Sequence, residues 1–309
     1  MKIAFVFPGQ GSQYVGMGKD VYENYAPARA VFDEASRALG YDVAHLCFNG
    51  PVEELNKTHR TQPCILTVSC AINSILREKE VQPSVVAGHS LGEYSALVAA
   101  GVMSFRDAVR LTEQRGRLMQ EAVPEGKGLM AAVLGLDREK VDQICGSLKS
   151  GYAAAANYNC PGQVVIAGEK PAVEEAIAIC KEAGAKRAIA LAVSVPSHCK
   201  LMSGASERLA GLLDAVEMTN PQIPVVNNAD AKFLDRVDEI KSSLTRQLNN
   251  PLLWEDSVRA MSGWGADTFI EVGPGKVLSG LIRRIVEART FGVEDSKSLQ
   301  NALSSLSQE

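Results

Sequence analysis

The sequence has few features of a metalloprotein, a secreted protein or a membrane protein. Its seven cysteines are scattered and form no CxxC pair, so neither a zinc site nor a disulfide framework is indicated. No apolar run approaches the length that spans a bilayer, and the first one is cut by Pro8, too early for a signal peptide. We therefore expect a cytoplasmic protein with reduced thiols and no bound metal.

An excess of charge of one sign is also missing. The formal net charge is −4 over 309 residues, so the composition predicts no general affinity for nucleic acid or for acidic membranes. Any basic docking surface must be local. Hydrophobic residues make up 46% and charged residues 22%, which is ordinary for a globular chain with one large domain or a large and a small one.

The apolar segments that the chain does contain alternate between strand-like and helix-like patterns. Residues 2–7 and 84–88 have the pattern of short buried strands. Residues 91–100 and 106–123 have helical patterns, ended by a glycine and by Pro124, respectively. Short apolar strands alternating with helices predict an α/β fold with a mainly parallel sheet.

The middle of the chain follows a different pattern. Its segments come in the order β-α-β-β-α-β, which is typical of the split βαβ arrangement of ferredoxin-like folds. They are residues 128–135, 137–148, 152–159, 163–168, 170–184 and 185–195. We predict that residues 126–195 form a small subdomain, inserted into a larger discontinuous core made by residues 1–125 and 196–309.

The stretch Gly88-His-Ser90-Leu-Gly92 matches the G-x-S-x-G pattern, in which a serine lies on a sharp turn between a strand and a helix. The glycines leave room where the chain doubles back, and the N-terminus of the following helix directs free N–H groups at the serine. The pattern predicts Ser90 as a nucleophile and the backbone N–H of Leu91 as a donor to the oxyanion. The alternative is that Ser90 only caps the helix.

A serine nucleophile needs a base, and histidine is scarce in this chain. The four histidines are at positions 45, 59, 89 and 198. His198 is the best candidate because it follows Pro196 at a strand end, where functional residues of α/β proteins gather. No carboxylate between Ser90 and His198 stands out as the third member of a triad, so a backbone carbonyl is a candidate for orienting the imidazole. A surface or capping histidine is the alternative.

Arg115 carries the first indication of a substrate. It lies between Leu111 and Leu118 on the apolar stripe of its predicted helix. A buried guanidinium needs an anion, because an unpaired buried charge is costly. That anion is either a carboxylate of the protein or a substrate carboxylate held by two parallel hydrogen bonds. The other alternative is that the side chain extends to the surface and keeps its charge in water.

The loop after the first strand, "PGQG", is a second candidate for binding an oxyanion. It resembles a dinucleotide-binding loop only superficially, since Tyr14 stands where the third glycine belongs. The backbone N–H of Gln10 could instead donate to an oxyanion beside the serine. A simple glycine turn is the alternative.

Taken together and in order, these segments resemble one family, the malonyl-CoA:acyl-carrier-protein transacylases of bacterial fatty-acid synthesis. The matching segments cover nearly the whole chain and are "FVFPGQGSQ", "AGHSLGEYSALVAAG", "QRGRLM", "ANYNCPGQVVIAG", "VSVPSHCKLM", "NNADA", "QLNNPLLWEDSV" and "FIEVGPGKVLSGLIRR". The resemblance implies an α/β fold with a hydrolase-like core and an inserted ferredoxin-like (βαββαβ) subdomain.

The resemblance also implies a mechanism. Ser90 attacks the malonyl thioester, and His198 takes up its proton and then gives it to the leaving thiolate. The backbone N–H groups of Gln10 and Leu91 form the oxyanion hole. The main-chain carbonyl of Gln247 orients the imidazole, which would account for the missing acid.

The remaining implied roles concern the acyl group and the partners. Arg115 pairs with the malonyl carboxylate, and Met119 and Ser197 contribute to substrate binding. Malonyl is the predicted acyl group, with methylmalonyl left open. The partners are malonyl-CoA and acyl carrier protein, and neither a metal nor a redox cofactor is required. We expect a monomer.

Two other functions remain as alternatives. An esterase or thioesterase shares the serine turn, but it usually carries its histidine near the C-terminus, whereas no histidine follows His198. It would also leave Arg115 unexplained. A non-catalytic docking module for carrier protein is disfavoured because Ser90 and His198 are both present.

Overall fold

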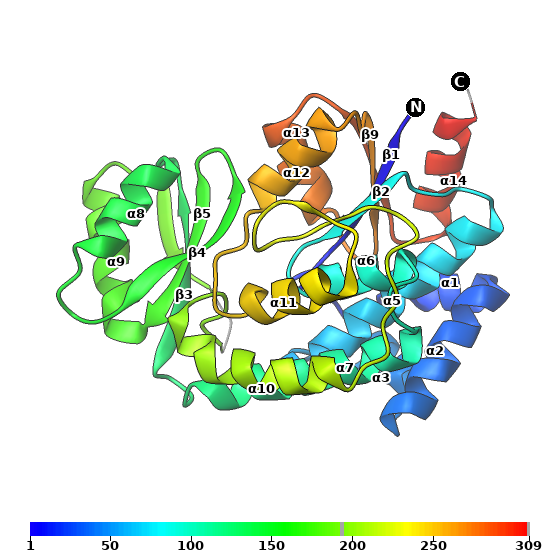
Figure 1. Ribbon diagram of the computed structural model, residues 1–309, viewed down its shortest axis with the longest axis horizontal. Coiled ribbons are helices and arrows are strands. Elements are labelled where there is room, and N and C mark those ends of the chain that lie inside the picture. Colours follow the sequence, from blue (N-terminus) through cyan, green and yellow to red (C-terminus); the bar gives the residue numbers. More distant parts are fainter. Residues whose placement is uncertain (192–194, 308–309) are drawn as a thin grey trace.

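The computed structural model describes residues 1–191 and 195–307, which form two sheets flanked by helices (Figure 1). The elements in chain order are β1 (Ile3–Phe7), α1 (Lys19–Asn24), α2 (Ala26–Leu39), α3 (Val43–Asn49), α4 (Val52–Leu55), α5 (Thr58–Glu78), β2 (Val85–Gly88), α6 (Gly92–Ala99), α7 (Phe105–Ala122), β3 (Gly128–Leu134), α8 (Arg138–Gly146), β4 (Ala153–Cys160), β5 (Gln163–Glu169), α9 (Lys170–Glu182), β6 (Arg187–Ala190), the 3₁₀ turn η1 (Lys200–Met202), α10 (Ser203–Asp214), β7 (Val225–Val226), β8 (Phe233–Leu234), α11 (Val237–Gln247), α12 (Trp254–Gly263), β9 (Thr268–Val272), α13 (Val277–Ile285), β10 (Arg289–Val293) and α14 (Ser296–Leu306).

The larger sheet is mainly parallel, as the sequence predicts. Its strand order is β10-β9-β1-β2-β7-β8, and only the last pair is antiparallel. The continuous apolar runs of β1 and β2 are buried on both faces, which is why they lack the polar alternation of a half-exposed strand. Phe7 pairs with Gly88 at the ends of these strands. The loop with Gln10 and the turn with Ser90 therefore leave the sheet side by side.

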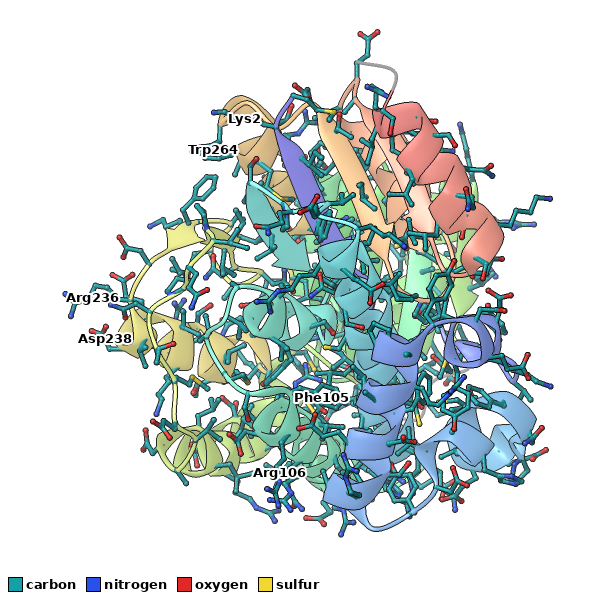
Figure 2. The ribbon with its side chains drawn as sticks, turned by 90° about the vertical axis from the view of Figure 1, so that its right-hand side faces the viewer. Lys2, Phe105, Arg106, Arg236, Asp238 and Trp264 are labelled. Atoms are coloured by element: carbon teal, nitrogen blue, oxygen red, sulfur yellow. The ribbon has the colours of Figure 1, made fainter. Side chains whose placement is uncertain are left out.

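Helices cover both faces of this sheet. Phe5 and Phe7 of β1 point into a core shared with α2, α5, α6, α7 and α10. Ala4 and Val6 point to the other face, where α12 and α13 pack. At one end of the molecule Lys2 lies against Trp264, with its Nζ 4.1 Å from the ring centre, so the start of β1 is tied to the end of α12 (Figure 2).

The smaller sheet is antiparallel, with strand order β4-β5-β3-β6, and lies to one side of the larger sheet (Figure 1). Its elements follow the predicted order β3-α8-β4-β5-α9-β6. Helices α8 and α9 cover one face. On the other face Met130 and Val165 pack near Cys199, which returns from the second half of the chain.

Element boundaries differ from the sequence patterns in small ways. The last strand of the small sheet, predicted over residues 185–195, is observed as Arg187–Ala190, and residues 192–194 of that prediction lie outside the described residues. The alanine-rich segment is strand β4 despite the low strand propensity of alanine, because it pairs with β5 along its length and most of its side chains are buried. Across the residues that the structure describes, no helix combines the length and apolar character needed to cross a membrane.

Candidate active site

Ser90 lies on a strained turn between β2 and α6. Its φ angle is 54°, a conformation that non-glycine residues seldom adopt. A Cβ atom at Gly88 would lie 1.9 Å from the carbonyl carbon of Gly92, and one at Gly92 would lie 2.0 Å from the carbonyl oxygen of Phe7. Both glycines are therefore required by backbone contacts. The turn presents the Ser90 hydroxyl to side chains from other elements rather than to the end of α6.

His198 lies beside Ser90 although 108 positions separate them in sequence. Its Nε2 is 2.8 Å from Ser90 Oγ, and its Nδ1 is 2.8 Å from the main-chain oxygen of Gln247. A carbonyl oxygen only accepts, so Nδ1 carries the proton and Nε2 presents its lone pair to the serine hydroxyl. Burial lowers the pKa of His198 to about 3, with a further contribution from the charge of Arg115. The imidazole is therefore neutral at neutral pH, as a general base must be.

Arg115 reaches the same point from the middle of α7. Its Nη1 donates to Gln62 Oε1 at 2.7 Å, and its Nη2 donates to Gln247 Oε1 at 2.9 Å and to Ser90 Oγ at 3.2 Å. The side chain is 1% exposed, and burial lowers its pKa. Within residues 1–191 and 195–307, no carboxylate forms an ion pair with it, and its Nε has no hydrogen-bond partner. A buried cation with neutral partners is suited to receive an anion from outside the protein.

The two backbone groups predicted to bind an oxyanion flank the serine. A Cβ atom at Gly9 would lie 2.3 Å from the carbonyl oxygen of His89, so the first loop packs directly on the serine turn. In the described part of the chain, neither the N–H of Gln10 nor that of Leu91 donates to a protein acceptor. The side chain of Gln10 is held by Thr58, 3.3 Å away. Free N–H groups beside a nucleophile are what an oxyanion hole requires.

A pocket opens over Ser90 between the two sheets. Its floor contains Ser90, His198 and Arg115, and Gln10, Met119 and Ser197 also line it. The small sheet contributes Met130 and Val165, and α13 contributes Val277, Leu278 and Leu281. Of the predicted site residues, Leu91 and Gln247 are not among the described residues that line the pocket, and Gln247 contacts the site through its main-chain oxygen and its side-chain amide.

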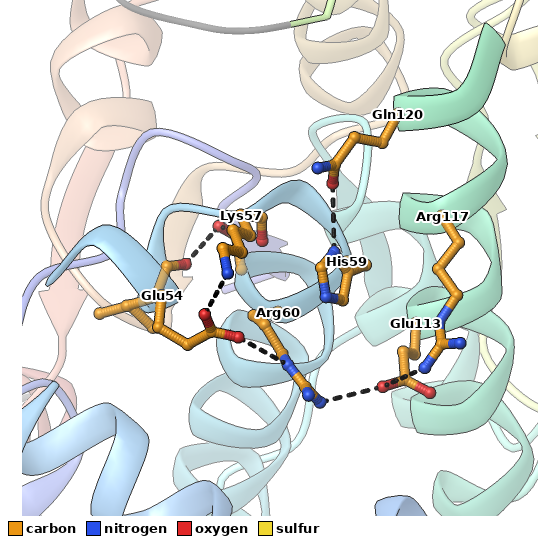
Figure 3. A network of polar contacts seen from close by, with 9 residues as sticks. Glu54, Lys57, His59, Arg60, Glu113, Arg117 and Gln120 are labelled. Carbon is orange, nitrogen blue, oxygen red and sulfur yellow. Dashed lines mark hydrogen bonds and ion pairs between the residues drawn. The ribbon is translucent and has the colours of Figure 1, made fainter. Parts of the chain in front are cut away.

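A surface network of charges ties together the helices that carry the arginine site (Figure 3). Arg60 of α5 binds Glu54 of α4 and Glu113 of α7, each at 3.2 Å, and Arg117 binds Glu113 at 3.3 Å. A Cβ atom at Gly116 would lie 2.6 Å from the Cα of His59, so α5 and α7 are in backbone contact at this level. These contacts fix the spacing between the helices that bear Gln62 and Arg115.

Two buried polar residues that the sequence patterns did not single out complete the site. Glu93 accepts hydrogen bonds from Gln247 Nε2 at 2.9 Å and from the backbone N of Asn228 at 3.0 Å. Asn228 also accepts from the backbone N of Ser90 at 2.8 Å. The available signal was Glu93 itself, an acidic residue in the otherwise uncharged helix "GEYSALVA".

The other histidines have structural surroundings. His89 Nε2 lies 2.9 Å from Asn159 Oδ1, and its ring packs edge-on against Trp254. His59 is bound to Gln120 at 3.1 Å in the network of Figure 3. Burial raises the pKa of the Cys199 thiol, next to His198, to about 11, so it stays protonated.

A neutral histidine hydrogen-bonded to a strained serine, on a parallel α/β sheet, is the arrangement that acyl transfer through a serine requires. The Acyl transferase domain family model matches residues 4–300. The chain belongs to this family, and more narrowly to its malonyl CoA-acyl carrier protein transacylases, so it is an acyltransferase as the sequence resemblance predicts.

The similar proteins span the whole chain. A Malonyl CoA-acyl carrier protein transacylase of Haemophilus influenzae is 52% identical over 301 residues, covering 96% of each chain. One from Bacillus subtilis is 45% identical, covering 100% of this chain and 98% of the relative.

Solved structures agree. A Vibrio cholerae acyl carrier protein S-malonyltransferase has a TM-score of 0.95 at 51% identity, covering 98% of this chain and 100% of that one. A malonyl-transacylase in complex with its type II PKS acyl-carrier protein has a TM-score of 0.97 at 50% identity, covering 99% of this chain and 100% of that one. Both the α/β fold and its two-sheet arrangement are thereby confirmed.

Proposed function

We propose that the protein moves a malonyl group from coenzyme A to the phosphopantetheine thiol of an acyl carrier protein, through a malonyl-Ser90 intermediate, and so supplies fatty-acid chain elongation. The names of its relatives support these substrates. The observation that carries the proposal is the position of Ser90 Oγ, which lies within hydrogen-bond distance of both a neutral base and an arginine that forms no ion pair with any described carboxylate. The base activates the serine hydroxyl as the nucleophile, and the arginine selects an acyl group that carries its own carboxylate.

The first half-reaction forms the acyl-enzyme. Ser90 Oγ attacks the thioester carbonyl carbon while His198 Nε2 takes the hydroxyl proton. The N–H groups of Gln10 and Leu91 stabilise the resulting oxyanion, by about 3 kcal/mol for each donor. Collapse breaks the carbon–sulfur bond, and the proton on Nε2 passes to the departing thiolate of coenzyme A. Gln247 contributes by accepting from Nδ1, which keeps Nε2 free to act as the base.

The second half-reaction reverses these roles. The carrier thiol gives its proton to His198 and attacks the malonyl ester, and the oxyanion again lies at the same two N–H groups. The bond between the acyl carbon and Oγ breaks, and Ser90 recovers the proton. The sequence is a ping-pong exchange between two thioesters, so it runs in either direction and needs no metal or redox cofactor.

Arg115 would bind the free carboxylate of the malonyl group. Its Nε and Nη2 form one edge of the guanidinium, suited to two parallel hydrogen bonds. In the resting site Nη2 donates to Ser90 Oγ at 3.2 Å. An arriving carboxylate would take over this donor, and the serine hydroxyl would then be left with His198 alone. Met119 and Ser197 line the pocket near this point and would contact the acyl group.

The proposal extends to the organisation of the chain. We propose that residues 126–195 act as a small subdomain over the core of residues 1–125 and 196–309, with the pocket between them. The enzyme is proposed to be a cytoplasmic monomer that binds neither nucleic acid nor membrane. Size-exclusion chromatography with light scattering would test the monomer directly.

Intact-protein mass spectrometry tests the central claim. The protein is mixed with malonyl-CoA, quenched in acid and weighed, beside a Ser90→Ala variant. We expect one malonyl adduct on the wild type and none on the variant, and rapid discharge of the adduct by holo acyl carrier protein but not by water. Multiple-turnover hydrolysis without any carrier dependence would instead identify a thioesterase.

A further inference from the structure

Glu93 is a buried carboxylate that the proposed mechanism leaves unused. It lies in the first turn of α6, three residues after Ser90, and is 1% exposed. Its Oε2 accepts from Gln247 Nε2 at 2.9 Å and from the backbone N of Asn228 at 3.0 Å. Both donors belong to residues that themselves touch the reacting groups.

Gln247 links Glu93 to the anion site and to the base. Its Nε2 donates to Glu93 and, at 3.0 Å, to the main-chain oxygen of Ser90. Its Oε1 accepts from Arg115 Nη2, and its main-chain oxygen accepts from His198 Nδ1. An amide has one donating and one accepting end. Because a carboxylate only accepts, Glu93 fixes the amide with its nitrogen inward and its oxygen toward the guanidinium.

The opposite orientation of the Gln247 amide would be unfavourable for Arg115. It would place an NH₂ group against guanidinium N–H donors, and Nη2 would lose its buried acceptor. The guanidinium would then have only Gln62 and the serine hydroxyl to hold it. Its Nε and Nη2 edge would no longer be fixed relative to Ser90.

Asn228 provides a second link from Glu93 to the serine turn. Its backbone N donates to Glu93, its Nδ2 donates to the main-chain oxygen of Gly88 at 2.8 Å, and its Oδ1 accepts from the backbone N of Ser90 at 2.8 Å. One carboxylate oxygen therefore holds the side chain of Gln247 in α11 and the backbone of Asn228 just after β7, and the side chains of both residues brace the strained turn.

The surroundings make ionised Glu93 costly to keep. The charge of Arg115 from α7 lowers the pKa of Glu93, and the charge of Glu93 in turn raises the pKa of Arg246 from α11. Two other titratable groups lie near Glu93: Asp230, from the loop after β7, and Tyr94, from its own helix. Arg246 is already paired with Asp230 at 2.6 Å. Burial outweighs these partners and raises the pKa of Glu93 to about 7. An apolar or amide side chain would be cheaper for folding alone.

We propose, on the basis of the transfer reaction above, that Glu93 is a positioning residue: its carboxylate orients the Gln247 amide and thereby holds Arg115 in place to receive the carboxylate of the acyl group. It does not touch the substrate. Its contribution is to the selection of dicarboxylic over monocarboxylic acyl groups.

The test compares Glu93→Gln with the wild type. The variant is nearly isosteric and retains one oxygen, but it lacks the charge that fixes the Gln247 amide. We expect kcat/KM for malonyl-CoA to fall about tenfold, as for the loss of one charge-assisted hydrogen bond, and kcat/KM for acetyl-CoA to fall much less. At pH 8 the thermal midpoint should be unchanged or higher, because a buried charge has been removed.

Ser95→Ala is the matched control. Ser95 lies on the same helix and is buried, and its hydroxyl has no hydrogen-bond partner among the described residues. We expect this variant to leave both kcat/KM values and their ratio unchanged. Loss of activity together with higher stability in Glu93→Gln is a combination that a merely structural residue would not produce.

An unchanged malonyl-to-acetyl ratio in a folded Glu93→Gln variant overturns the proposal, as does an equal fall for both substrates. If the variant does not fold, the pH dependence of the wild type tests the proposal instead. The ratio of kcat/KM for malonyl-CoA to that for acetyl-CoA should decrease as pH falls through about 7, where Glu93 takes up a proton. Titration of the coenzyme A phosphates affects both substrates equally and therefore cancels in this ratio. A ratio that stays flat from pH 6 to pH 8.5 rejects the proposal, whereas absence of any malonyl adduct on wild-type Ser90 rejects the proposed function itself.

Discussion

Replacing Arg115 by alanine separates recognition of the acyl carboxylate from the chemistry at the serine. The guanidinium is 1% exposed and forms no ion pair with a carboxylate of the described chain, so a substrate carboxylate would be its main anionic partner. Hydrogen bonds to charged groups contribute about 1.5–3 kcal/mol each. Losing a two-bond contact of this kind costs about 3–6 kcal/mol, or about 10²- to 10⁴-fold in kcat/KM for malonyl-CoA.

Acetyl-CoA offers no carboxylate to Arg115, so its transfer should fall by less than about tenfold. The remaining loss reflects the 3.2 Å contact between Nη2 and Ser90 Oγ and the 2.9 Å contact that helps to place Gln247. Steady-state transfer to holo acyl carrier protein, measured with both thioesters, gives the comparison directly.

Stability must be measured beside activity, because the substitution leaves buried acceptors on Gln62 and Gln247 without a donor. Each such acceptor costs about 1–3 kcal/mol, partly offset by removal of a buried charge. Arg115→Lys retains the charge but loses the planar fork, and should give an intermediate malonyl rate. Equal losses for malonyl and acetyl in a folded Arg115→Ala variant would refute the carboxylate role and favour a structural one.

Three further predictions concern the serine turn and its base. Because the pKa of His198 is lowered to about 3, acylation by acetyl-CoA, which does not use the Arg115 site held by Glu93, should show no inflection between pH 5 and 8, and an inflection near 6.5 in stopped-flow acylation by acetyl-CoA would contradict a buried neutral base. The unfolded chain binds the extra proton below about 6.5, so this histidine also lowers stability as pH falls from there toward 3, measurable by urea unfolding against a His198→Gln variant. Gly92→Ala would place a Cβ atom 2.0 Å from the Phe7 carbonyl oxygen, so we expect loss of soluble folded protein or a thermal midpoint lowered by many degrees, whereas Gly211→Ala, at an open helical position, should be tolerated.

Local patterns accounted for most of the fold. The apolar run of β1, the β-α-β-β-α-β order and the helix of Arg115 are set by side-chain periodicity and by glycine or proline at the ends, which act over a few neighbouring residues. Strand ends were less well predicted. The apolar pattern of segment 185–195 continues beyond Ala190, the last residue of β6, because periodicity does not show how far a strand stays paired with its neighbour, here β3.

The residues of the site likewise divide into those that a local pattern predicts and those that it does not. Ser90 can be predicted from the sequence because a G-x-S-x-G turn needs its two glycines within five positions. His198 is one of four histidines and is distinguished only by its place at a predicted strand end, and Gln247 is indicated only by the resemblance to a family. No local signal connects these positions, since 108 residues separate the serine from its base and 49 separate the base from Gln247.

The sequence by itself determined the class of fold, the strained serine and an arginine on an apolar helix face, because each depends on residues close together in the chain. Only the tertiary structure decided which partners meet: among the described residues Arg115 donates to neutral amides and pairs with no carboxylate, and Glu93 accepts from one of those amides. The physical reason is that burial and hydrogen-bond direction are properties of the packed molecule. A carboxylate that looks incidental on a short helix becomes the acceptor around which a buried network is oriented.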